Sequence, residues 1–207
     1  VHTESEKKPE PIAEGEVSAA LLAEVGTGRV VYEYNSEEKL PAAGLTRLAA
    51  LVSVCKGFDE GRLKPGDAVS VSEKAAGIGG TTAFLKAGEQ MDAETMLLAA
   101  VMINAGDATH SLALAAAGSE SAAVQEINAC MAGIGVETNF SEICGAGEKL
   151  SASELAKIGA ALTASGSYRK FGTKFYEKIE HNTGAGKSEQ TGETVFGLHR
   201  CRHGFIN

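Results

Sequence analysis

A serine that stands three residues before a lysine can supply a nucleophile and a base for acyl transfer. Three such strings occur in this chain, at residues 5–8, 53–56 and 167–170. Short motifs of this kind also arise by chance, so we interpret all three as ordinary helical or surface positions. None of the three strings is therefore taken as the catalytic centre.

A second set of reactive side chains lies near the C-terminus. His199, Cys201 and His203 alternate along the chain, and on a strand they would point to one face, as three ligands of a zinc ion could. A fourth ligand is not evident, and the neighbouring Arg200 and Arg202 would repel a dication. We therefore expect an exposed terminal strand, no metal and no cofactor.

The segment 41–48, which reads PAAGLTRL, stands at the start of an expected helix. From Leu45 to Lys56 apolar residues recur at helical spacing, and Gly57 stands where the helix could end. A glycine at a helix start is a tolerated cap residue, so Gly44 by itself needs no functional explanation. The residues at positions 44 and 47 in this segment become important when they are compared with a known catalytic motif.

Several blocks of the chain, in order, resemble the penicillin-binding D-alanyl-D-alanine carboxypeptidases. Residues 41–48 resemble that family's P-A-S-L-T-K, residues 79–89 resemble G-G-S-S-M-F-L-K-P-G-E, and residues 104–108 follow a helix as S-G-N-D-A does. Residues 21–35 resemble its first hairpin, and the resemblance covers about residues 17–180. It implies an α+β fold of the beta-lactamase/DD-transpeptidase-like type, with a helical subdomain packed on a small antiparallel sheet.

The chain departs from the family pattern at the residues that carry out the reaction. Gly44 stands in place of the serine nucleophile of S-x-x-K, and glycine has no oxygen that could form an acyl-enzyme. Arg47 stands in place of the lysine, and a guanidinium stays protonated, so it cannot accept the serine proton. Ser53 lies nine residues beyond Gly44, about 13 Å along a helix, so it could not replace the missing serine.

The second and third motifs are also altered. The family's S-x-N corresponds to Asn104-Ala105-Gly106, which keeps one amide and has no hydroxyl. The K-T-G motif corresponds to residues 190–192, with glutamine in place of lysine, or it falls beyond residue 207. The resemblance implies that the degenerate catalytic positions are Gly44, Arg47, Asn104 and Gly106, and that the substrate-binding candidates are Arg47, Asn104, Gln190, Thr191 and Gly192.

The environment of Arg47 has three possible forms. Its guanidinium could pair with an acid such as Asp107, lie on the surface, or fill the former lysine pocket with its hydrogen bonds satisfied. The glycine-rich segment 79–82 is interpreted as a turn that needs glycine torsions, because no G-K-[ST] follows as in a phosphate-binding loop.

The hydrophobic pattern predicts a hairpin, then helices, then strands. We expect a flexible leader over residues 1–15 and one domain over 16–207, with a sheet that is incomplete at the C-terminus and has an open edge. That edge could be completed by a partner chain or a swapped strand. The expected strands are 17–24, 29–34, 67–72, 174–179 and a region of mixed β character at 194–207, and the expected helices are 45–56, 92–103, 108–117, 120–134 and 151–164.

Composition excludes some functions. The net charge of −8 and the lack of a basic run argue against nucleic-acid binding. The longest apolar stretch, 96–103, is too short for a membrane span. The cysteines form no CxxC pair, and Cys55 and Cys130 fall in helical patterns typical of buried free thiols.

The resemblance and the altered motifs together predict an extracytoplasmic protein of peptidoglycan metabolism that is catalytically inactive. It would act by binding a peptidoglycan stem peptide or an envelope protein. Two alternatives stay open. One is an active serine-type carboxypeptidase with an unrecognised or altered nucleophile, and the other is a structural envelope or assembly protein whose cleft is filled by its own side chains.

Overall fold

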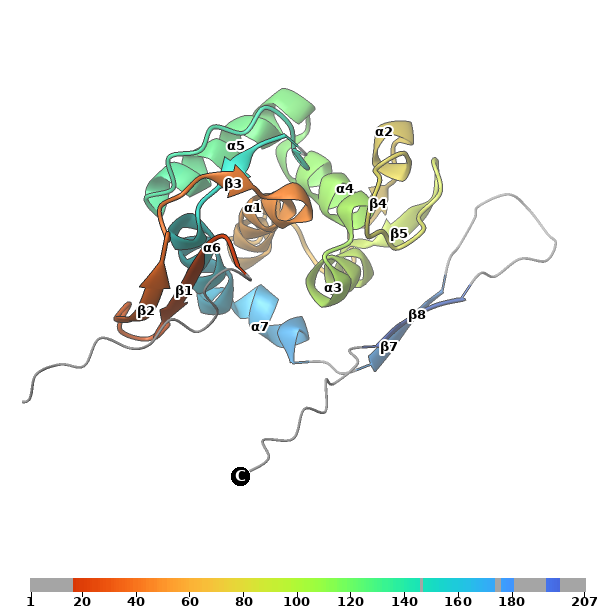
Figure 1. Cartoon of the computed structure of the whole chain (residues 1–207). Coiled ribbons are helices and arrows are strands. Elements are labelled where there is room, and N and C mark those ends of the chain that lie inside the picture. Colours follow the sequence, from red (N-terminus) through yellow and green to blue (C-terminus); the bar gives the residue numbers. More distant parts are fainter. Residues whose placement is uncertain (1–16, 146, 174–175, 181–192, 198–207) are drawn as a thin grey trace, which may run out of the picture.

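The computed structural model describes residues 17–145, 147–173, 176–180 and 193–197. Helices and short antiparallel strands alternate along these residues, in agreement with the α+β class (Figure 1). The helices are η1 (Ala43–Thr46), α1 (Arg47–Asp59), α2 (Glu73–Ala76), α3 (Ala93–Ile103), α4 (Gly106–Ala117), α5 (Glu120–Gly133), α6 (Ala152–Ala164) and α7 (Gly166–Gly172). The strands are β1 (Ala20–Ala23), β2 (Val30–Tyr34), β3 (Leu40–Pro41), β4 (Ala68–Ser70), β5 (Gln90–Asp92), β6 (Lys149–Leu150), β7 (Tyr176–Glu180) and β8 (Glu193–Gly197).

Helix α1 is the central element of the helical body. It contacts α4, α5, α6 and α7, and Leu51, Val54 and Cys55 on it are almost completely buried (Figure 1). The prediction that this helix ends at Gly57 was wrong, since α1 continues to Asp59. Gly57 is buried next to Ala116 of α4, so tertiary packing outweighs the low helix propensity of glycine.

The described strands form four separate antiparallel pairs. They are β1–β2, β3–β6, β4–β5 and β7–β8. The β1–β2 hairpin pairs Ala20 with Tyr34 and contains an irregularity between Leu22 and Ala23. Strands β3, β5 and β6 were not predicted, because two or three residues are too few to show an alternating pattern. The β3–β6 pair places residues 40–41, just before η1, beside residues 149–150, just before α6.

Side-chain caps set the starts of two predicted helices. Asp92 caps α3 by accepting a hydrogen bond from the Thr95 backbone at 2.9 Å. Ser151 caps α6 in a reciprocal capping box with Glu154. Ser153 instead donates its backbone N–H to the Ser36 carbonyl at 3.0 Å.

The prediction of buried free thiols at two cysteines is confirmed. Cys55 and Cys130 are buried free thiols, and burial raises the pKa of Cys55 to about 12. Over the described ranges, the helices lack the length and apolar character needed to cross a bilayer. The predicted leader 1–15 lies outside the described residues.

Candidate functional site

The candidate site begins at η1, the short helical turn that leads into α1. Gly44 lies in this turn and is exposed, whereas the residue that caps α1 is Thr46, so Gly44 is not the helix cap that the sequence suggested. A Cβ atom placed on Gly44 would meet no atom within 4 Å. Space therefore does not require a glycine here, and a serine would fit.

Arg47 is the first residue of α1, and its side chain turns into the protein. The residue is only 8% exposed. Its guanidinium donates to the carbonyl oxygen of Thr81 at 2.7 Å, to that of Asn104 at 3.3 Å, and to that of Gly79. Backbone carbonyls thus satisfy the buried cation. Of the three environments left open by the sequence, this is the buried and hydrogen-bonded one.

Asp107, the acid that the sequence offered as a partner of Arg47, is engaged elsewhere. Its carboxylate is 1% exposed and accepts hydrogen bonds from the backbone N–H of Ala83 at 2.9 and 3.0 Å and of Leu85 at 3.0 Å. It also accepts from Ala108 at 2.9 Å, at the start of α4. Arg47 and Asp107 therefore hold different parts of the same loop, residues 79–85.

Two glycines make room for the guanidinium. A Cβ atom on Gly106 would lie 2.7 Å from Cζ of Arg47 and 2.8 Å from Cγ2 of Ile78. On Gly80, where φ is +82°, a Cβ atom would lie 3.0 Å from Nη2 of Arg47. The positive φ agrees with the glycine torsions predicted for segment 79–82, where the chain bends at residues 80 and 81. Arg47 thus occupies the volume that a side chain at position 106 would need.

Asn104 connects the end of α3 with η1. It adopts the left-handed conformation with φ of +55° and ends α3. Its side-chain amide donates to the carbonyl oxygen of Gly44 at 2.9 Å. The other side-chain atom, Oδ1, is buried and has no hydrogen-bond partner among the described residues. The four motif positions 44, 47, 104 and 106 therefore lie together in the structure.

Sequence reasoning missed the loop that closes the other side of the site. Cys144 donates from Sγ to the carbonyl oxygen of Gly106 at 3.5 Å, and burial raises its pKa to about 12. The hydroxyl of Thr46 donates to the carbonyl oxygens of Gly145 and, at 2.8 Å, of Ala43. No local motif marks Cys144, because its role comes from contacts distant in sequence.

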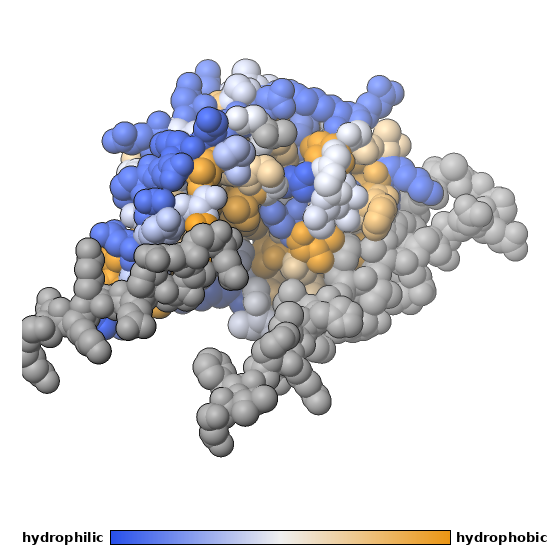
Figure 2. All heavy atoms as spheres, in the orientation of Figure 1, coloured by the Kyte–Doolittle hydropathy of each residue, from blue (hydrophilic) through white to orange (hydrophobic). Residues whose placement is uncertain are grey.

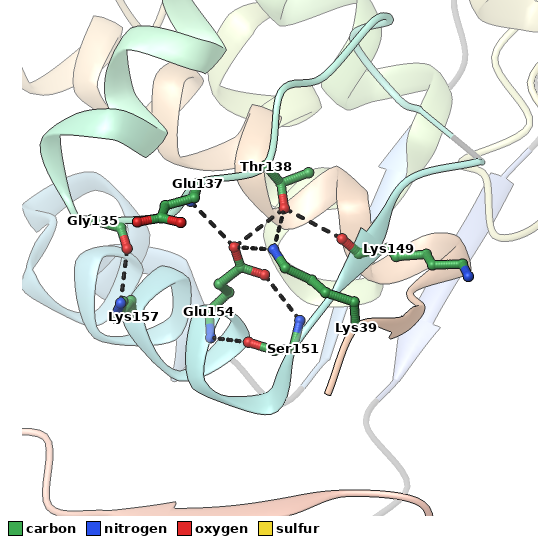
Figure 3. A network of polar contacts seen from close by, with 8 residues as sticks. All are labelled: Lys39, Gly135, Glu137, Thr138, Lys149, Ser151, Glu154 and Lys157. Atoms are coloured by element: carbon green, nitrogen blue, oxygen red, sulfur yellow. Dashed lines mark hydrogen bonds and ion pairs between the residues drawn. The ribbon is translucent and has the colours of Figure 1, made fainter. Parts of the chain in front are cut away.

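A polar network holds the chain that enters η1 (Figure 3). Lys39 donates to Oε1 of Glu154 at 2.5 Å and to the hydroxyl of Thr138 at 2.9 Å. Glu154 also accepts from the backbone N–H of Ser151 at 3.0 Å and of Glu137 at 3.2 Å. Burial acts to raise the pKa of Glu154, but the bonds from Lys39 and the backbone outweigh it and lower the pKa. The network fixes residues 39–41 relative to α6.

The serine–lysine strings do not form nucleophile–base pairs in the described structure. Ser53 is buried within α1, whereas Lys56 is exposed. The Ser167 hydroxyl donates to Asp59 at 2.6 Å, and Lys170 pairs with Glu94. The string at 5–8 lies outside the described residues.

The remaining predicted sites lie at the C-terminus. Gln190, Thr191 and Gly192, and also His199, Cys201 and His203, fall outside the described residues, so both stay predictions. Within the part that the structure describes, no group of three His, Cys, Asp or Glu side chains could hold a metal ion.

Comparisons with known proteins show which family this chain resembles. The family described as D-alanyl-D-alanine carboxypeptidase (peptidase S11) matches residues 3–195. The D-alanyl-D-alanine carboxypeptidase DacF of Bacillus subtilis is 31% identical over 81% of this chain and 44% of its own length. DacC of Escherichia coli is 28% identical over 70% of this chain and 38% of its own length. The chain thus spans less than half the length of these curated relatives.

Solved structures show the same fold. A D-alanyl-D-alanine carboxypeptidase from Mycobacterium tuberculosis has a TM-score of 0.72 at 20% identity, over 90% of this chain and 68% of that chain. DacD from Francisella tularensis has a TM-score of 0.72 at 22% identity, over 80% of this chain and 41% of that chain. The fold is therefore that of the penicillin-binding proteins and DD-transpeptidases. With the family match over most of its length, the chain belongs to the D-alanyl-D-alanine carboxypeptidase family.

Proposed function

We propose that this chain binds a peptidoglycan peptide ending in D-alanyl-D-alanine and does not hydrolyse it. The observation that carries the proposal is the pair of residues at the start of α1. Gly44 has no side-chain oxygen, and the Arg47 guanidinium is committed to the carbonyls of Gly79, Thr81 and Asn104. The site therefore offers neither the nucleophile nor the base of the family's S-x-x-K motif.

The hydrogen bonds that hold the backbone around these positions favour a binding function over a complete loss of function. The amide of Asn104 still joins α3 to η1 at 2.9 Å, and Gly106 still donates its backbone N–H to the Thr81 carbonyl at 3.0 Å. Gly44 remains exposed, with free space where its side chain would be. A surface of this kind could accept a peptide end without forming a covalent bond. Peptidoglycan as the ligand would place the protein in the cell envelope.

Labelling with a fluorescent penicillin tests the loss of acylation. A penicillin reports the reactive serine because it forms a stable ester with it. We expect no covalent label on this chain under conditions in which DacF of Bacillus subtilis is labelled. A label mapped by mass spectrometry to any serine of the chain would contradict the proposal and support an active serine-type enzyme.

A calorimetric titration tests the binding half of the proposal. The ligand is an acetylated tripeptide that ends in D-Ala-D-Ala, and the control ligand is the same peptide ending in L-Ala-L-Ala. We expect saturable binding of the D,D peptide and at least about tenfold weaker binding of the L,L peptide, which corresponds to about 1.4 kcal/mol. Absence of saturable binding would reject the proposal and favour a structural role in envelope assembly.

A further inference from the structure

The large apolar side chains that are exposed among the described residues form two groups. Hydrophobic residues reach the surface at several places on the face drawn in Figure 2. Five of the large ones belong to the β1–β2 hairpin or directly precede it: Val17, Leu22, Val25, Val30 and Val31. The other two belong to segments of the candidate site. They are Leu45, directly after Gly44 and 46% exposed, and Phe84, which is 72% exposed.

Phe84 is held in a conformation that suits a bulky residue poorly. Its φ is +59°, in the left-handed region, which is strained for residues with a large side chain. The carboxylate of Asp107 binds the backbone N–H groups on both sides of it, those of Ala83 and Leu85. Ala83 and Leu85 are buried at 0% and 4% exposure, so the clamp turns these two inward while Phe84 stays exposed.

The segments that carry Leu45 and Phe84 are fixed to each other. Arg47, two residues after Leu45, donates to the carbonyls of Gly79 and Thr81 in the loop that continues to Phe84. The Thr81 carbonyl also accepts from Gly106, next to Asp107. The buried bonds of Arg47 and Asp107 therefore hold the backbone segments that carry both exposed side chains.

We infer that Leu45 and Phe84 are the apolar contact residues for the peptide ligand, an inference that rests on the proposed function. The strained backbone at Phe84 costs stability, and its exposed ring returns little to the fold, so the strain points to a contact outside the chain. A peptide that ends in two alanines presents methyl groups and no large side chains. An aromatic ring on a clamped backbone and a leucine directly after Gly44 suit such methyl groups, because burying them gains affinity without ordering long side chains.

The test measures affinity and stability in the same variants. In Phe84→Ala and Leu45→Ala we expect the acetylated D-Ala-D-Ala tripeptide to bind about tenfold and about threefold more weakly. In Phe84→Gly we expect a similar loss of affinity together with a higher melting temperature, because glycine relieves the left-handed strain. Val31→Ala is the matched control, since it removes an exposed apolar side chain from the hairpin and should change neither quantity.

The outcomes separate this inference from the proposed function. Unchanged affinity in Phe84→Ala and Phe84→Gly, with normal binding by the unmodified protein, would overturn only the role of Phe84. A lower melting temperature in Phe84→Gly would assign the ring to the fold and would also overturn it. If the unmodified protein does not bind the peptide, the proposed function fails first and this inference falls with it.

Discussion

At the scale of single residues, the side chain of Arg47 links two of the altered motif positions, 47 and 106. A guanidinium has five N–H donors in a planar fork, and three carbonyl oxygens around it accept from two of its nitrogens. A lysine ammonium could not bond this set in the same plane. The cation also needs a glycine at position 106, where a Cβ atom would lie 2.7 Å from Cζ. Arginine at 47 and glycine at 106 are therefore mutually dependent.

A double-mutant cycle measures this dependence. Gly106→Ala should lower the free energy of unfolding by about 2 kcal/mol, because the added methyl group overpacks against Arg47 and Ile78. Arg47→Ala should lower it by about 3 kcal/mol, since buried carbonyls lose their donors. In the Arg47→Ala background, Gly106→Ala should cost about half as much, because only the contact with Ile78 remains.

Urea unfolding of the four proteins gives the coupling energy directly. Simple additivity of the two substitutions would show that the guanidinium does not occupy the space beside Gly106. Arg29→Ala is the control arginine, since its side chain is 76% exposed and its contact with Glu24 is 3.9 Å long. It should change the free energy of unfolding by less than about 0.5 kcal/mol.

At the scale of elements, the network around Glu154 joins α6 to the segment before η1. The Glu154 side chain is 7% exposed, whereas Lys39 is 44% exposed. Glu154→Ala should lower the free energy of unfolding by about 3 kcal/mol, because two backbone N–H groups and Lys39 lose their acceptor. Lys39→Ala should cost about 1 kcal/mol, since its position is half open to water and Glu154 keeps its backbone donors. Thermal or urea unfolding of both variants would contradict this asymmetry if the two costs were equal.

Helices α2, α4 and α5 meet at a buried histidine. His110 on α4 is 2% exposed, and its Nε2 lies 2.8 Å from Glu120 at the start of α5. Lys74 on α2 also pairs with Glu120 at 2.7 Å, and Glu142 acts on His110 through its charge. Burial lowers the pKa of His110, although Glu120 opposes the shift. Nδ1 is buried and has no partner in the described part of the chain.

This histidine should make the fold less stable in mild acid. The pKa of His110 is lower in the folded than in the unfolded chain, where it stays near the ordinary 6.5. As the pH falls below that value, the unfolded state binds the proton first, so the free energy of unfolding falls. Glu120, whose pKa is lowered mainly by Lys74, adds a further loss at lower pH.

Urea unfolding between about pH 7.5 and about pH 5.5 measures how protonation of His110 changes the free energy of unfolding. The free energy of unfolding of the unmodified protein should fall across this range. His110→Gln, which cannot take up a proton, should show a shallower slope. Equal slopes in the two proteins would mean that His110 has the same pKa in the folded and unfolded chain.

At the scale of the whole molecule, the β1–β2 hairpin leaves an apolar surface open. A groove of about 510 Å³ runs between the hairpin and α6, lined by apolar and small residues that include Leu22, Val25, Val30 and Ala160. Leu22 and Val30 are 54% and 48% exposed. Exposed apolar surface of this kind promotes association between molecules.

Charged substitutions in the groove should therefore reduce association. Leu22→Lys combined with Val30→Lys should lower any self-association of the chain at about 100 μM. Sedimentation velocity measures this change. Thr27→Lys, in the hairpin turn and outside the groove, is the control for added charge. Equal association of the two charged variants would show that the groove is not the contact surface.

Much of the fold could be predicted from local patterns. The hairpin, the buried helix after residue 44 and the helix at 151–164 follow from hydrophobic periodicity, which depends on neighbours in the sequence. The continuation of α1 through Gly57 and the short strands β3, β5 and β6 could not be predicted. They depend on contacts with distant segments, such as the pairing of Leu40 with Leu150.

The sequence by itself determined which reactive atoms the site lacks. A glycine at 44 has no oxygen and an arginine at 47 cannot act as the base, wherever the chain places them. Only the tertiary structure decided what Arg47 does instead. Its three carbonyl partners come from loops 32 to 57 residues away, and its choice of them over Asp107 follows from the carboxylate being saturated by Ala83 and Leu85. Such a choice depends on which polar groups remain unpaired once the chain has packed, and this is not encoded in any local pattern.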